Sequence, residues 1–261
     1  MNIAGRLGRY LMGFAVTAIG VESLVLGIPV RRLEPIPAAF PGITVIAYLS
    51  GAAFVAIGVG ILIDKWARLA AGVLAIVLLA WVVLLYGPLL AVRQEAAWLG
   101  TFETFACFSG AWMLAAFMPA ESRLRGWNTL IERGTRLGRF GFGISLPVFG
   151  LAHFVYPEFV ASWIPKWLPL PPLFWAYFTG VAHVAAGVGI LTPVIPRLAA
   201  LLAATMYGSW VLIVHIPRTL AAPHDAMEWN GIFVATMLCA SALLAADAVT
   251  RAKYTNTPAV R

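Results

Sequence analysis

The chain has 261 residues, of which 61% are hydrophobic and only 11% are charged, and its mean hydropathy is +0.88. A soluble globular domain carries about 25% charged residues, so this composition excludes that class and indicates an integral membrane protein. The net charge of +7 does not indicate a nucleic-acid partner, because no basic stripe with interleaved aromatic residues occurs.

Eight apolar segments approach the ~20 residues that a helix needs to cross a bilayer. They cover residues 8–27, 43–63, 67–87, 97–117, 138–156, 173–192, 198–216 and 229–248. Arginines precede the first segment, as in a signal peptide, but no small-residue cleavage site follows it, so we expect that segment to remain as a span. The predicted fold is all-α: a polytopic membrane protein with eight transmembrane helices.

The distribution of basic residues predicts the orientation. An even number of spans places both chain ends on one side of the membrane. Of the 18 Lys and Arg residues, thirteen fall on that side, and five fall on the other: Arg31, Arg32, Arg93, Lys166 and Arg218. The positive-inside rule then makes both the N-terminus and the C-terminus cytoplasmic.

The chain repeats its own pattern. Gly51 and Gly58 recur as Gly180 and Gly187, and residues 7–9 (LGR) recur as residues 137–139, at offsets of 129 and 130 residues. We therefore predict two four-helix-bundle repeats, residues 1–117 and 137–261, joined by a basic cytoplasmic linker at residues 118–136. Four spans is an even number, so both repeats are oriented in parallel. The linker is either an amphipathic helix on the membrane surface or a solvated segment.

Three histidines at membrane level all belong to the second repeat. They are His153, His183 and His215, and the corresponding first-repeat residues are Ser23, Phe54 and Tyr86. A histidine inside an apolar span is costly and usually has a partner or a function. We therefore expect the candidate site in the second repeat and regard the first repeat as a degenerate scaffold.

The spacing of these histidines predicts a shared cavity. His153 and His215 lie near the extracytoplasmic ends of their helices, and His183 lies about ten residues into its span, ~15 Å deep. Gly150 lies three residues before His153, and Gly180 and Gly187 lie three residues before and four residues after His183. Residues at these spacings share a helix face, so we expect both imidazole rings on helix-packing faces. The predicted ligand-binding residues are His153, His183 and His215, together with Glu158 and Tyr177. No catalytic residue is identified.

The second repeat resembles the DoxX-like family of bacterial integral membrane proteins. The segments that carry the resemblance are LGR (137–139), GLAHFVYPEF (150–159), YFTGVAHVAAGVGIL (177–191) and LIVHIPR (212–218). The resemblance implies four-span bundles in the bacterial inner membrane. Because the family takes its name from a subunit of a thiosulfate:quinone oxidoreductase, it also implies a link to redox systems. The fused repeat without histidines departs from that pattern.

Three functions stay open at this level. The first is a redox-associated subunit that binds a quinone or similar apolar ligand, since imidazole can hydrogen-bond a carbonyl and relay a proton near neutral pH. The second is a non-enzymatic assembly or accessory subunit that packs, through its glycine faces, against other membrane or redox subunits. The third is a His-ligated metal-dependent membrane enzyme, although no HxH or HxxxH spacing occurs and no metal ligand is assigned. Purely structural histidines, bonded to backbone carbonyls, are the further alternative.

Overall fold

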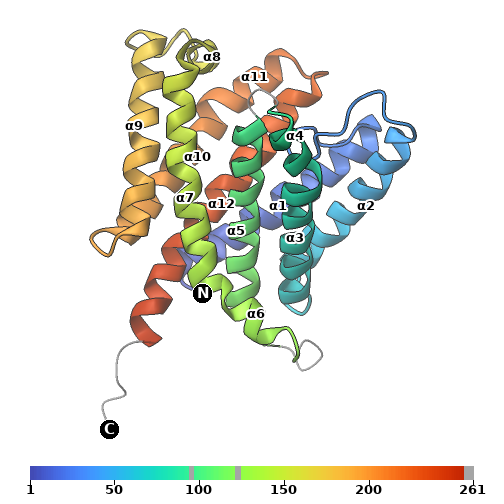
Figure 1. Cartoon of the computed structure of the whole chain (residues 1–261), viewed down its shortest axis with the longest axis vertical. Helices are drawn as coiled ribbons and strands as arrows, with labels where there is room; N and C mark the ends of the chain where they lie inside the picture. Colours follow the sequence, from blue (N-terminus) through green and yellow to red (C-terminus); the bar gives the residue numbers. More distant parts are fainter. Residues whose placement is uncertain (94–96, 121–124, 256–261) are drawn as a thin grey trace.

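A computed structural model describes residues 1–93, 97–120 and 125–255, and within these ranges the chain forms helices and no strands (Figure 1). The first half contains α1 (Ile3–Leu26), α2 (Ile43–Leu62), α3 (Ala67–Trp81) with its continuation through the π-helix η1 (Val82–Tyr86) into α4 (Gly87–Ala91), and α5 (Ala97–Phe117). The short α6 (Asn128–Glu132) follows. The second half contains α7 (Gly134–Val155), α8 (Pro157–Trp163), α9 (Pro172–Leu191), α10 (Pro196–Trp210) with its continuation through the π-helix η3 (Val211–His215) into α11 (Ile216–Ala221), and α12 (Ala226–Thr255).

Seven of these helical segments are long and apolar enough to cross a membrane: α1, α2, α3 to α4, α7, α9, α10 to α11, and α12. The all-helical class and the membrane-spanning character of the helices agree with the sequence. The fourth predicted span does form a 21-residue helix, α5, at residues 97–117. It is not among the seven, because Glu103 and several hydroxyl side chains lower its hydropathy.

The interior of the bundle is formed by α5 and α12. Of the most apolar 18-residue stretch of α12, 94% is buried inside the protein, a larger share than in the same kind of stretch in any other of the seven segments. Helix α1 packs against α2 and α12, whereas α7 packs against α9 and α5. The first helix of each half therefore packs against the last helix of the other half, and α3 and α10 cover α5 and α12 respectively.

Glycines permit these close helix contacts. A Cβ atom on Gly8 would lie 2.9 Å from the Ala240 carbonyl oxygen in α12, and one on Gly20 would lie 2.5 Å from the Gly51 carbonyl oxygen in α2. A Cβ atom on Gly150 would lie 2.7 Å from the Gly180 carbonyl oxygen in α9. Small residues allow van der Waals contact between helix backbones. The predicted glycine faces are thus occupied by helices of the same chain.

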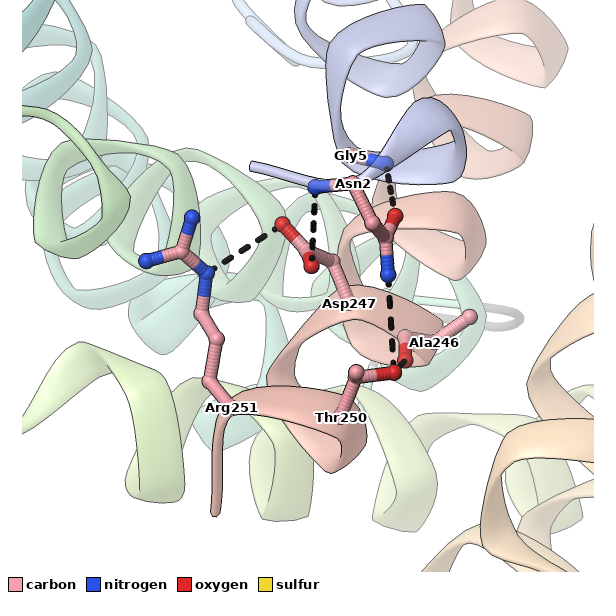
Figure 2. Close-up of polar contacts among 6 residues, drawn as sticks. All are labelled: Asn2, Gly5, Ala246, Asp247, Thr250 and Arg251. Carbon is pink, nitrogen blue, oxygen red and sulfur yellow. Dashed lines mark hydrogen bonds and ion pairs between the residues drawn. The ribbon is translucent and has the colours of Figure 1, made fainter. Parts of the chain in front are cut away.

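The start of α1 and the end of α12 lie at one end of the bundle, and α4, α8 and α11 lie at the opposite end (Figure 1). Polar contacts join the two helices there (Figure 2). The Asn2 backbone N–H donates to Asp247 at 3.3 Å, and the Asn2 side-chain amide donates to Thr250 at 3.4 Å. The Asn2 side-chain oxygen also accepts from the Gly5 N–H at 3.0 Å, so the same residue caps α1 and anchors it to α12.

The predicted linker contains one short helix. The five residues of α6 lie beside the end of α5, where the Trp112 indole N–H donates to the Leu130 carbonyl at 3.2 Å. Residues 121–124, with the predicted cytoplasmic Arg123, lie outside the described residues, as does Arg261.

Candidate functional site

Two adjoining hollows of about 180 and 190 Å³ lie in the second half of the molecule beside α8. His153 and His183 line both hollows, and His215 lines the larger one. The structure therefore brings together the three histidines that the sequence singles out. Together we call the two hollows the histidine cavity. Eight residues line both of them: Arg32, Glu103, His153, Phe159, Val160, His183, Tyr207 and Leu238.

His153 and His183 face each other across the contact between α7 and α9, with ring centroids 4.9 Å apart. The Nδ1 atom of His153 lies 2.8 Å from the Phe149 carbonyl oxygen, and that of His183 lies 2.7 Å from the Thr179 carbonyl oxygen. Because a carbonyl oxygen only accepts, we assign the ring proton to Nδ1 in both residues. Each neutral ring then keeps Nε2 as a hydrogen-bond acceptor.

Two residues that line the histidine cavity carry a buried polar atom with no hydrogen-bond partner among the described residues: the Tyr207 hydroxyl and Nδ1 of His215. His215 ends the π-helix η3, and a Cβ atom on Gly231 of α12 would lie 2.7 Å from its Nδ1. Leaving a buried polar atom unpaired costs about 1–3 kcal/mol. The two atoms therefore favour an occupant that carries polar groups of its own.

Trp163 of α8 covers one side of the histidine cavity. Its ring lies 5.9 Å from the His215 ring, and the Arg218 guanidinium carbon lies 4.0 Å from its centroid. Arg218 is held in place by Glu228, to which Nε donates at 3.0 Å. This cation–π contact fixes α8 against α11 and α12.

The first half supplies two charged side chains to the histidine cavity. Nε of Arg32 lies 3.7 Å from a carboxylate oxygen of Glu103 in α5. The Arg32 carbonyl oxygen accepts a hydrogen bond from the Tyr86 hydroxyl at 2.6 Å. Neither residue was predicted as part of the site, although a glutamate inside an apolar segment was an available signal. The half expected to act as a scaffold therefore contributes directly to the cavity lining.

Glu158 and Tyr177 do not line the histidine cavity. Glu158 is exposed in the first turn of α8. Tyr177 is exposed on α9, where its ring stacks on Phe154 with centroids 6.0 Å apart. The structure thus separates these two residues from the three histidines.

Two apolar side chains replace polar rings in the corresponding region of the first half. Phe54 stands where the second half has His183, and Leu78 stands where it has Tyr207. Both apolar side chains are almost fully buried, and the Phe54 ring makes an edge contact with Trp81 at 5.2 Å. The two halves therefore differ at the positions of His183 and Tyr207, whereas Ser23 and Tyr86 keep polar groups at the positions that correspond to His153 and His215. Among the described residues, no three His, Cys, Asp or Glu side chains come together in a way that could hold a metal ion.

Comparison with known proteins adds one match. A family described as a domain of unknown function (DUF8561) matches residues 142–251, which include all three histidines and most of α7 to α12. No curated protein and no solved structure matches the chain. The resemblance to the DoxX-like family stays a prediction from the sequence.

Proposed function

We propose that the chain is a DoxX-like multipass protein of the bacterial inner membrane and a redox-associated subunit that binds a quinone or a similar apolar ring compound in the histidine cavity. In this proposal α5 is the eighth crossing, both chain ends are cytoplasmic, and the cavity faces the extracytoplasmic side. The observation that carries the proposal is the convergence of three imidazoles on one hollow.

The helix boundaries support two parallel repeats. Helices α2 and α9 both have 20 residues, and α3 and α10 both have 15. The first-half helix of each pair begins 129 residues before its second-half counterpart, and the π-helices η1 and η3 are separated by the same offset. The reciprocal packing of α1 on α12 and of α7 on α5 has the same symmetry.

The size and polarity of the histidine cavity suit one substituted ring. A cavity of about 150 Å³ is large enough to hold benzene, and the larger hollow has about 190 Å³. The Tyr207 hydroxyl can donate to a quinone carbonyl, and His215 can do so through the ring nitrogen that carries its proton. The Nε2 atoms of His153 and His183 can accept from the hydroxyl groups of the reduced form. The site thus offers partners to both redox states of a quinone.

The structure gives less support to the other two functions. The accessory-subunit hypothesis used the glycine faces as contact surfaces for other subunits, and these glycines pack within the chain. The metal-enzyme hypothesis needs a ligand cluster, which the described residues do not form. We therefore retain ligand binding as the proposed function.

The test is a calorimetric titration of the purified chain in detergent with a water-soluble short-chain quinone. We expect binding to weaken in His153→Ala, His183→Ala and His215→Ala, because each removes a hydrogen-bonding group from the cavity. His224→Ala is the matched control, since His224 is exposed and lies outside the histidine cavity. Equal affinity in the three cavity variants and the control would reject the proposal.

A further inference from the structure

A second polar hollow, of about 720 Å³, lies between α7 and α12 at the opposite end of the bundle. It is near the contacts shown in Figure 2, where α12 ends and α1 begins. We call it the arginine hollow. Its polar and aromatic lining consists of Glu132, Thr135, Arg136, Arg139, Phe140 and Arg251.

The charges of the arginine hollow are mostly positive. Within the described residues, neither Arg136 nor Arg139 forms an ion pair, and the Arg139 guanidinium carbon lies 4.8 Å from the Phe140 ring centroid. Arg251 is oriented by Asp247, to which its Nε donates at 3.2 Å (Figure 2). The Glu132 carboxylate lies 4.0 Å from Arg68. Arg136 and Arg139 therefore bring to this hollow two guanidinium groups that pair with no carboxylate of the described residues.

Comparison with the first half shows what an internally satisfied arginine looks like. Arg9, which corresponds to Arg139, donates to the Ile61 carbonyl at 2.7 Å and to the Leu62 carbonyl at 2.9 Å. It also pairs with Asp64. The residue that corresponds to Asp64 in the second half is Pro193, which offers no carboxylate. In the first half the chain itself neutralises Arg9. In the second half no carboxylate stands at the corresponding position, so Arg139 can pair with another anion.

We propose that the arginine hollow binds the phosphate of an anionic phospholipid from the membrane leaflet at that end. Guanidinium groups pair with phosphate oxygens through two parallel hydrogen bonds. Basic pockets between membrane-spanning helices on the cytoplasmic side take anionic head groups. Phe140, Ala248 and Ala252 supply an apolar wall for the adjoining acyl chains. This site depends on the proposed membrane placement, but not on the ligand of the histidine cavity.

The experiment measures lipid binding to the full chain in detergent by native mass spectrometry, with thermal unfolding as a second readout. Phosphatidylglycerol is compared with phosphatidylcholine of the same acyl chains. We expect phosphatidylglycerol to bind more tightly and to raise the unfolding temperature more. Each basic residue near an anionic lipid surface contributes about fivefold in affinity. Arg136→Gln/Arg139→Gln should therefore reduce the preference for phosphatidylglycerol by roughly thirtyfold.

The matched control is Arg6→Gln/Arg197→Gln. It removes the same two charges from exposed positions at the start of α1 and α10, outside the arginine hollow. The control should keep the preference of the unmodified chain. Equal binding of the two lipids, or an equal loss in the control, would overturn the proposal. An equal rise in unfolding temperature with inorganic phosphate would also overturn it, because the site would then take a soluble anion. If the double variant does not fold, Arg136→Gln alone serves, since Arg136 is exposed, with an expected loss of about fivefold.

Discussion

The side chain of His183 can be replaced in a way that separates ligand binding from folding. The centroid of the His183 ring lies 5.9 Å from that of Phe149 and 5.6 Å from that of Tyr207, both in edge contacts. In His183→Phe the new ring should keep these contacts. The change removes the hydrogen bond to the Thr179 carbonyl, worth about 1 kcal/mol. Burial of the added apolar edge offsets part of that loss, so we expect the unfolding temperature to change by less than about 4 °C. The first half already holds a buried phenylalanine, Phe54, at the corresponding position.

The same substitution should affect ligand binding strongly. A quinol hydroxyl that loses its acceptor in a buried site costs about 1–3 kcal/mol, which corresponds to a loss in affinity of about five- to 150-fold. Titration calorimetry of the reduced ligand, beside thermal unfolding of the same preparation, measures both quantities. The reasoning is refuted if affinity is unchanged, or if the protein loses stability as severely as it loses affinity, because His183 would then serve packing alone.

Three further predictions concern packing, pH and the contact between α1 and α12. Gly180→Ala would place a methyl group 2.8 Å from the His153 Cβ atom; it should lower the unfolding temperature and weaken binding, whereas Gly72→Ala, with nothing within 4 Å of the new atom, should be neutral or stabilising. Burial raises the pKa of Glu34, in the loop between α1 and α2, from 4.5 to about 7. The stabilising contribution of Glu34 should therefore be complete below about pH 4.5 and be lost as the pH rises to 7, by roughly 3 kcal/mol in total, so the unfolding temperature of Glu34→Gln should fall less over this range than that of the unmodified chain. Asp247→Ala removes the acceptor that holds the start of α1, so hydrogen–deuterium exchange of residues 3–8 should accelerate while that of α9 stays constant.

The sequence predicted the helices well because their signals are local. The helix α2 begins at Ile43, where the apolar segment was expected to begin, and α5 covers the expected residues 97–117. The helix α8 was not expected, since its residues lie between the predicted spans 138–156 and 173–192. The length and the apolar residues of α5 made it resemble the other spans, although it is less apolar than the seven. Its buried hydroxyl groups and Glu103 make sense only when neighbouring helices surround it.

The candidate site was predictable in part, because only the second half has polar residues where the first half has apolar ones. That comparison identified His153, His183 and His215, which the structure brings to one cavity. The same comparison did not identify first-half residues whose side chains reach the cavity. Arg32 lies in a loop of the first half and reaches the cavity through tertiary packing. The spacing of residues along one helix does not predict such a contact.

The packing of α1 on α12 has a consequence for synthesis of the protein. Helix α1 leaves the ribosome long before α12 exists, so its contact at Gly8 faces lipid or the insertion machinery in the meantime. The same delay applies to the inner surface of α5, whose neighbour in the bundle centre is also α12. Neither half can bury its interior while the other is missing. A chain cut between the halves should therefore assemble only when both pieces are produced in the same cell.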